Sequence, residues 1–318
     1  MDSGPRNNMN IVKHRKIFYS ISIALVVISI VALSVWRLLP SIDFTGGTLI
    51  EVSYGQTNLQ LGSSTDPQTR PDQAIITSAL KSIDPAVSVR PTGANDYIIR
   101  MKAIDQNGKI AVTSALSLNG TASSTIASFD SVGPVLGAEA LRKSVVSILL
   151  VILGIILYIT WAFRKVSEPV SSWKYGLIAV VSLLHDVVIP LGAFAILGHY
   201  LGYEVDTLFV TAVLVILGFS VHNTIVVFDR VRENLRNQGD RKPFNEIVGE
   251  SISQTFTRSM NTSATVIMSL IVLYIFGGSA TAHFTLALII GIAAGTFSSV
   301  FIGSPLLVTL EGWQGKGE

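Results

Sequence analysis

The sequence predicts a multi-pass α-helical membrane protein with six spans and one extracytoplasmic α+β domain. Three observations lead to this fold class: an apolar composition, six long apolar runs, and one long polar stretch after the first of them. Only 14% of the 318 residues are charged and the mean hydropathy is +0.54, whereas a soluble domain carries about 25% charged residues. The chain contains no cysteine, which excludes structural disulfides and thiolate metal sites.

A helix needs about 20 residues to cross about 30 Å of hydrocarbon, and each of the six apolar runs is close to this length or longer. We expect spans at 17–37, 144–163, 175–197, 208–228, 260–276 and 284–310. Basic residues precede the first run, as in a secretory signal. Its apolar core is too long for a signal peptide, however, and no small-residue cleavage pattern follows it. The first run is therefore predicted to be a retained anchor.

The distribution of lysine and arginine predicts the orientation. The tail 1–16 holds four of these residues, and the segments 164–174 and 229–259 hold three and six. The short loops 198–207 and 277–283 hold none. Because cytoplasmic loops carry the excess of basic residues, we expect both termini, including the tail 311–318, to be cytoplasmic. The segment 229–259 is expected to form a cytoplasmic loop with an amphipathic helix.

The segment 38–143 is long enough for a small extracytoplasmic domain. Apolar–polar alternation and turn residues predict strands at Thr48–Tyr54, Ala86–Arg90, Tyr97–Ala103 and Phe129–Val132. Helical patterns occupy Asp72–Ile83 and Lys109–Ile126. The resulting order, βαββαβ, is that of a ferredoxin-like fold. The domain contains no histidine and no phosphate loop, so a binding or mechanical role is favoured over catalysis.

Five stretches of the chain together resemble SecF, an accessory subunit of the bacterial Sec protein translocase in the SecD/SecF family. They are SIDFTGGTLIEV, VGPVLGAE, LLHDVVI, GFSVHNTIVVFDRVREN and ESISQTFTRSMNTS. The resemblance implies that the protein is not an enzyme but pairs with SecD in the bacterial cytoplasmic (inner) membrane. It also implies association with the SecYEG channel, protonmotive force driving late stages of polypeptide export, and kinship with the resistance-nodulation-division exporters. Nucleic acid is not an expected partner.

The chain departs from the family pattern in the fourth span. Relatives usually read Asn-Asp-Thr there, and that aspartate is implicated in proton conduction. Here the positions hold His222, Asn223 and Thr224. Asparagine cannot titrate, so Asn223 is expected to be structural. Two hypotheses remain: His222 carries the proton, because histidine is the residue type that most readily changes its charge near neutral pH, or SecD supplies the titrating carboxylate.

Polar residues within the spans are the candidates for an ion relay, because an ionisable group at bilayer depth costs at least about 2.5–3.5 kcal/mol unless it faces protein or water. Asp186 lies near the middle of the third span, and Arg258 matches an arginine that relatives use in proton conduction. The candidate relay comprises Asp186, His222, Asn223, Asp229 and Arg258. Protons, or alternatively sodium, are the expected coupling ion, with no cofactor and no metal.

Helical periodicity places these residues on polar rows. One row in the fourth span contains Thr211, Gly218, His222 and Asp229, and one in the fifth contains Arg258, Thr262, Thr265 and Ser269. Structural roles are open for each candidate. Asp186 and His222 could hydrogen-bond between helices, Arg258 could extend its charge to the interface, and Asp229 could belong to a solvated charged cluster.

Two groups of small residues have predicted structural roles. Gly291, Gly295, Ser299 and Gly303 recur every fourth position in the sixth span, a spacing that allows close helix packing. After the first span, Asp43, Gly46 and Gly47 are predicted to form a domain–membrane hinge, because paired glycines permit a sharp turn.

Two rival functions remain open at this stage. His185 and His222 lie on neighbouring predicted spans and could in principle ligate a haem in a membrane oxidoreductase. A stand-alone small-molecule exporter of the resistance-nodulation-division type is the other, although such chains usually have twice as many spans.

Overall fold

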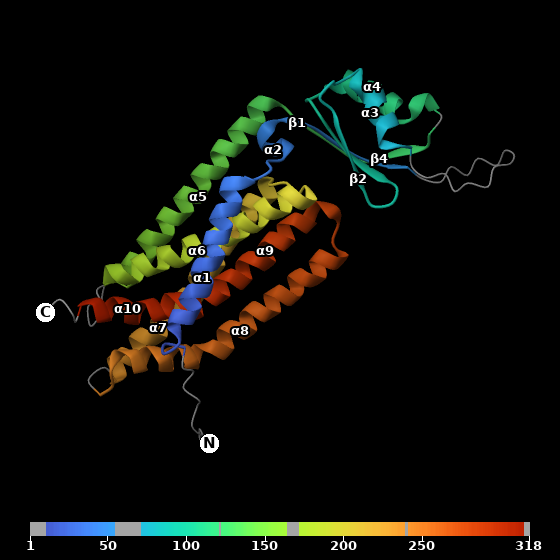
Figure 1. Ribbon diagram of the computed structural model, residues 1–318. Coiled ribbons are helices and arrows are strands. Elements are labelled where there is room, and N and C mark those ends of the chain that lie inside the picture. Colours follow the sequence, from blue (N-terminus) through green and yellow to red (C-terminus); the bar gives the residue numbers. More distant parts are fainter. Residues whose placement is uncertain (1–10, 55–70, 121, 164–171, 239–240, 315–318) are drawn as a thin grey trace. The chain divides into compact units, whose positions relative to one another are not determined.

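The computed structural model describes residues 11–54, 71–120, 122–163, 172–238 and 241–314. The chain divides into two compact units (Figure 1). Residues Pro40–Lys143 form what we call the α+β unit, and Met1–Leu39 with Ser144–Glu318 form the helical unit.

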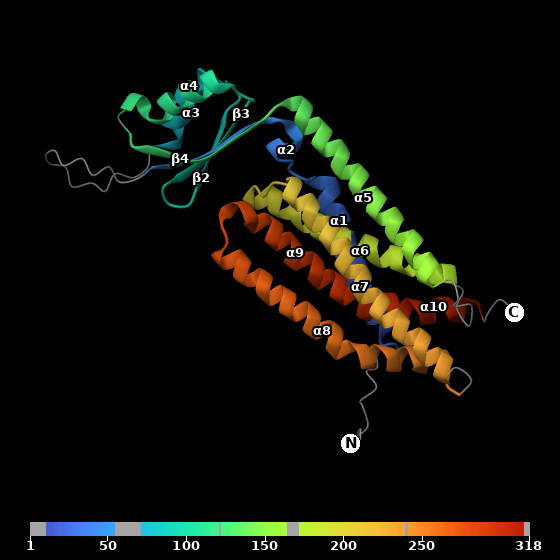
Figure 2. The same cartoon turned by 180° about the vertical axis from the view of Figure 1, so that it is seen from behind.

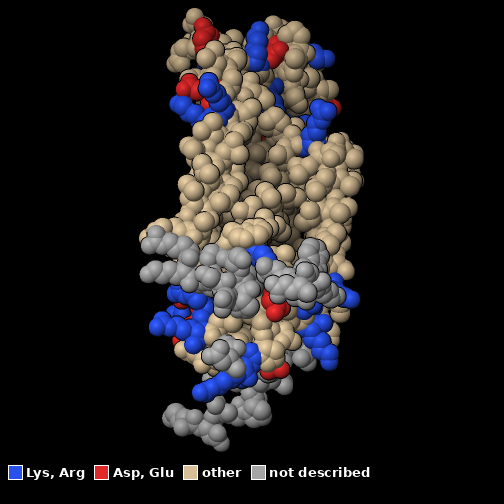
Figure 3. Space-filling model, turned by 90° about the vertical axis from the view of Figure 1, so that its left-hand side faces the viewer, with Lys and Arg blue, Asp and Glu red and all other residues tan. Residues whose placement is uncertain are grey.

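Long helices make up the helical unit. They are α1 (Arg15–Val35), α5 (Pro134–Ala162, whose first turns up to Lys143 belong to the α+β unit), α6 (Ser172–Leu201), α7 (Thr207–Gln238), α8 (Phe244–Phe276), α9 (Ser279–Ser298), the π-helical turn η2 (Ser299–Gly303) and α10 (Ser304–Gln314). Within the described residues, six helical segments are long and apolar enough to cross a membrane, the sixth being the continuous run Thr281–Glu311. The prediction of a multi-pass protein with six candidate spans is confirmed. Figure 3 shows a band without Lys, Arg, Asp or Glu across one face.

The central helices of this unit are α6, α7 and the run containing α9. In the apolar 18-residue stretch of each helix, half of the residues of α6 and of α7 are buried. The buried share is 67% for Thr281–Glu311 but only 6% for α5. Figure 2 shows α7, α8 and α9 side by side, in agreement with their mutual contacts. Polar groups that have to be shielded from lipid are therefore expected on α6, α7 and α9.

The helices α7 and α8 extend well beyond the predicted spans, so most of segment 229–259 is helical. Ion pairs at i, i+3 spacing, such as Arg232 with Asp229 at 2.7 Å, support a polar helical continuation. Asn234 of α7 donates a hydrogen bond to Ser251 of α8 at 2.8 Å. The polar ends of α7 and α8 are thus fastened to each other.

The α+β unit contains a four-stranded antiparallel sheet with the strand order β2-β3-β1-β4. Its elements are α2 (Ile42–Thr45), β1 (Gly47–Tyr54), α3 (Gln73–Lys81), β2 (Ser88–Thr92), β3 (Asp96–Met101), α4 (Gln106–Leu116), the 3₁₀ turn η1 (Leu118–Gly120) and β4 (Ser124–Val132). On the central strands, Ile50 pairs with Ile99. Both are fully buried with Ile76 and Leu80 of α3, so α3 covers this face of the sheet.

The predicted helical pattern at Lys109–Ile126 is wrong at its C-terminal end. The helix α4 ends at Leu116, and the strand β4 already begins at Ser124. Between them the backbone takes positive φ at Leu118 (48°) and Gly120 (90°), a conformation that ends a right-handed helix.

Asp84 connects two loops of the α+β unit and should make its stability sensitive to acid. Its carboxylate accepts hydrogen bonds from the backbone N–H of Lys102 at 2.7 Å and of Ala86 at 2.9 Å. The bond from Lys102, which has the larger effect, and the bond from Ala86 hold the pKa of Asp84 below its ordinary value. The stabilisation is therefore complete above an ordinary carboxyl pKa of about 3.9 and is lost as the pH falls through the lowered folded value.

We expect Asp84→Asn to destabilise the α+β unit by about 1–3 kcal/mol near neutral pH and to remove this part of the acid sensitivity. Hydrogen exchange at the Lys102 amide of the full chain, corrected for the intrinsic effect of pH, measures both. Unchanged protection at neutral pH in the variant would contradict the assignment.

Candidate functional site

A buried carboxylate joins three central helices of the helical unit. Asp186 of α6 is fully buried. One carboxylate oxygen, Oδ2, accepts a hydrogen bond from Ser220 of α7 and another, at 2.8 Å, from Ser298 of α9. The other, Oδ1, lies 2.8 Å from Nδ1 of the neighbouring His185. A change in the charge of this carboxylate would act directly on the contacts among α6, α7 and α9.

Small residues allow the three helices to approach at this cluster. A Cβ added to Gly295 would lie 3.1 Å from Cβ of Ser220 and 3.5 Å from Oδ2 of Asp186. Gly291, one turn earlier, packs against Ile216 of α7, and Gly303 packs against Ser182 of α6. Ser299 is also fully buried. The four-residue row of α9 and η2 thus faces α6 and α7.

Several buried polar side-chain atoms of the helical unit lack a hydrogen-bond partner among the described residues. They are Oη of Tyr175, Oγ of Ser182, Nε2 of His185, Nδ2 of Asn223 and Oγ of Ser259. All five residues are at least nine-tenths buried. Unpaired polar groups in an apolar interior are costly. Such positions suit a site that exchanges partners or admits an ion or water.

The relay candidates on α7 and α8 do not join this cluster. Asn223 is buried, on the inward side of α7 that also carries Ser220, whereas His222 and Asp229 are exposed. Arg258 of α8 is exposed as well. Within the described part of the chain, no hydrogen bond or ion pair connects His222 or Arg258 to Asp186.

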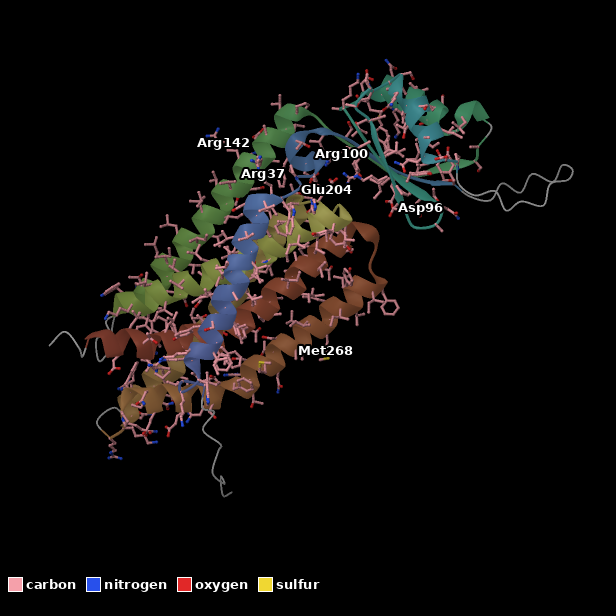
Figure 4. All side chains as sticks on the ribbon, in the orientation of Figure 1. Arg37, Asp96, Arg100, Arg142, Glu204 and Met268 are labelled. Atoms are coloured by element: carbon pink, nitrogen blue, oxygen red, sulfur yellow. The ribbon has the colours of Figure 1, made fainter. Side chains whose placement is uncertain are left out.

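Both polar rows predicted from helical periodicity face away from the other helices of this chain. The exposed members are Thr211, Gly218, His222 and Asp229 on α7 and Arg258, Thr262, Thr265 and Ser269 on α8. Met268, on the same helix, is 58% exposed, and Figure 4 shows its side chain pointing outward. We call these eight residues the outward polar rows.

The histidines of the haem hypothesis do not face a common space. His185 is buried and contacts Asp186, whereas His222 lies on the exposed side of α7. Among the described residues, no group of three or more His, Cys, Asp and Glu side chains is arranged to hold a metal ion.

Sequence reasoning missed both partners of Asp186 on other helices. Ser220 and Ser298 occur in apolar runs, where isolated serines commonly bond to their own helix. Ser263 and Thr296, which connect α8 and α9 by a 2.7 Å hydrogen bond, were missed for the same reason. The position of Ser298 three residues after Gly295, on the neighbouring part of the same helix face, was the available signal.

The predicted hinge residues lie where strand β1 begins. Gly46 has φ of 72° and ψ of 165°, and an added Cβ would lie 2.7 Å from Cα of Pro134. Gly47 pairs with Val132 at the end of β4. Asp43 lies in the short helix α2, where its N–H donates to Ser41 at 3.1 Å. The two segments that connect the α+β unit to the spans are thus in backbone contact here.

Comparison with known proteins identifies the family of the chain. Residues 112–313 match the family described as protein export membrane protein SecD/SecF, C-terminal, and residues 40–57 match the SecD/SecF GG motif. The protein translocase subunit SecF of Thermobaculum terrenum is 41% identical over 313 residues, which cover 97% of this chain and 95% of the relative. That of Anaerolinea thermophila is 35% identical, covering 95% and 94%. The crystal structure of SecDF from Thermus thermophilus superimposes with a TM-score of 0.78 at 25% identity, covering 99% of this chain and 40% of that chain.

The six candidate spans define a multi-pass membrane protein, and the match to the SecD/SecF family model assigns it to the protein-export class. The chain belongs to the SecF family of protein translocase subunits. The resemblance found in the motifs is confirmed. The role of the chain is in Sec-dependent protein export.

Proposed function

We propose that this chain couples an ion gradient across the bacterial cytoplasmic (inner) membrane to late stages of polypeptide export. It would do so with SecD at the SecYEG channel. One observation carries the proposal: the fully buried carboxylate of Asp186 accepts hydrogen bonds from two other helices. Gain or loss of a charge there would change the stability of the three-helix contact, because the strength of these hydrogen bonds depends on the charge of the acceptor. No catalysis by the chain is required.

The coupling works through two packings of the helices. A proton on Asp186 weakens the hydrogen bonds that its carboxylate accepts from Ser220 and Ser298, and the resulting change in helix packing moves the α+β unit. We propose that this unit has a ferredoxin-like fold and lies on the outer side of the membrane. Both termini would lie in the cytoplasm. Moving one charge through 100 mV supplies about 2.3 kcal/mol, which shifts a two-state equilibrium by roughly fiftyfold. Sodium is the alternative coupling ion.

The outward polar rows support the pairing with SecD. An exposed histidine or arginine at bilayer depth is costly against lipid, so His222 and Arg258 call for a protein surface or a wet crevice beside them. SecD is the proposed occupant, because the SecDF chain that this chain resembles is much longer than the part matched.

Export measured in membrane vesicles that lack the native SecF subunit tests the proposed function. Adding the chain with SecD should restore the stimulation of export by the protonmotive force, and an ionophore should abolish it. Export that is restored equally with and without the ionophore would contradict energy coupling. Replacing the proton gradient by a sodium gradient distinguishes the two coupling ions.

His222→Gln tests whether the outward row of α7 carries charge. We expect export to fall by at least about tenfold, the equivalent of 1.4 kcal/mol, because glutamine keeps a polar side chain but cannot titrate. Thr211→Val, on the same row, is the control for a change in polarity alone. Co-purification with SecD shows whether assembly is intact.

Full export activity in both His222→Gln and His222→Asn would instead indicate that SecD supplies the titrating carboxylate. Restoring the aspartate of relatives by Asn223→Asp is the companion experiment. It places a carboxyl group on the inward side of α7, where Asn223 is 2% exposed, in addition to that of Asp186 on α6.

A further inference from the structure

The two edges of the sheet in the α+β unit differ in how well they are protected. The strand order puts β2 at one edge and β4 at the other (Figure 1). The β2 edge is five residues long and contains Arg90 and Pro91. A short strand, a proline without an N–H and a charged side chain are the usual means by which an edge avoids pairing with another chain. The β2 edge is therefore closed to augmentation.

The β4 edge has little of this protection. It is nine residues long and contains no lysine, arginine or proline, and Asp130 is its one charged residue. One protecting feature is present, a β-bulge at Ala127 between the pairs Glu51–Ser128 and Val52–Ile126, which interrupts the register with β1. On the side of β4 away from β1, no strand pairs with it among the described residues. The backbone N–H and C=O groups on that side can form hydrogen bonds with an extended polypeptide.

The side chains of β4 indicate what kind of segment would pair there. Ile126 and Phe129 point to the core face and are only partly buried, because the sheet ends beside them. On the opposite face, Thr125, Ser128 and Asp130 are small or polar. An added strand with apolar residues at alternate positions would continue the core past Ile126 and Phe129 while its polar residues face water.

We propose that the outer edge of β4 binds an extended segment of the exported polypeptide by β-strand addition. The inference rests on the proposed role in export, where the cargo is an unfolded chain. Main-chain hydrogen bonds supply affinity without reading sequence, which suits cargo of varied sequence. The polar composition of the edge favours this transient occupant over a permanent subunit interface, which would be more hydrophobic.

Cysteine crosslinking to a stalled exported polypeptide tests the proposal, since the chain itself contains no cysteine. The reporter is Thr125→Cys on β4, and the matched control is Arg90→Cys on the β2 edge; both positions are exposed. Single cysteines are scanned along the stalled polypeptide. For Thr125→Cys, strand addition predicts disulfide yields that alternate along the stalled polypeptide with a period of about two residues. For Arg90→Cys it predicts yields at least about threefold lower, a difference equivalent to under 1 kcal/mol.

A second variant tests the edge itself. Adding Ser128→Lys to the reporter places a protecting charge on the edge and should lower crosslinking by at least about threefold, whereas Thr92→Lys on the β2 edge should not. Yields without alternation, equal yields from both edges, or capture of SecD or of a second copy instead would overturn the proposal. Loss of energy-dependent export with the unmodified chain would instead refute the proposed function, so the two failures are distinguishable.

Discussion

Asp186→Asn is expected to abolish the stimulation of export by the protonmotive force with the protein still assembled. Asparagine has nearly the same size and still accepts a hydrogen bond, but it cannot bind or release a proton. If one charge crossing the membrane supplies about 2.3 kcal/mol, the stimulated rate should fall by up to about fiftyfold. Export in vesicles with an imposed proton gradient measures the loss, and co-purification with SecD checks the assembly.

Ser298→Ala is the matched control for this substitution. It removes one hydrogen bond to Asp186, 2.8 Å long, but retains the carboxyl group. Its effect should be near the 0.5–1.5 kcal/mol, or roughly two- to tenfold, of a single hydrogen bond. Wild-type export by Asp186→Asn would show that the carboxylate fastens helices together and carries no ion.

Gly46→Ala is expected to cause the largest loss of stability in the α+β unit. The backbone at Gly46 lies in a region open essentially to glycine alone, with φ of 72° and ψ of 165°, which costs another residue about 1–3 kcal/mol. The new Cβ would also lie 2.7 Å from the backbone of Pro134, and overpacking of this kind adds about 1–3 kcal/mol. Together these are a large part of a typical stability of about 5–15 kcal/mol.

Gly120→Ala separates the two causes. Gly120 also has positive φ, 90°, but an added Cβ would meet nothing within 4 Å among the described residues. Gly120→Ala should therefore show backbone strain alone and lose about half as much. Hydrogen exchange across β1 and β4 of the full chain reports both variants. Equal protection in the two would show that the contact with Pro134 is unimportant.

The sequence was sufficient for the elements that depend on local patterns. The length of apolar runs predicted six candidate spans, and alternation with turn residues predicted four strands, because these signals lie within short windows. The last strand was predicted only at Phe129–Val132, whereas β4 begins at Ser124. The end of the helix α4 was predicted less well, since apolar residues at Ile110 and Ile126 fit a helical pattern while the positive φ of Gly120 is not visible in it. Long-range pairing then determined where β4 begins.

The candidate site was only partly predictable for a different reason. Ionisable residues such as Asp186 are conspicuous in an apolar run, but their partners are not. Ser220 lies 34 positions from Asp186 and Ser298 lies 112 positions from it, so only the packing of α6, α7 and α9 brings them together. Helical periodicity grouped Thr211 with His222 correctly, yet it could not tell whether that row faces the interior or the outside.

The backbone contact at Gly46 has a second side that also requires glycine. Gly137 of α5 approaches so closely that an added Cβ would lie 2.8 Å from the amide nitrogen of Gly46. A side chain at either position would therefore have to push the outgoing and returning segments of the chain apart, so this crossing needs a glycine on both of them.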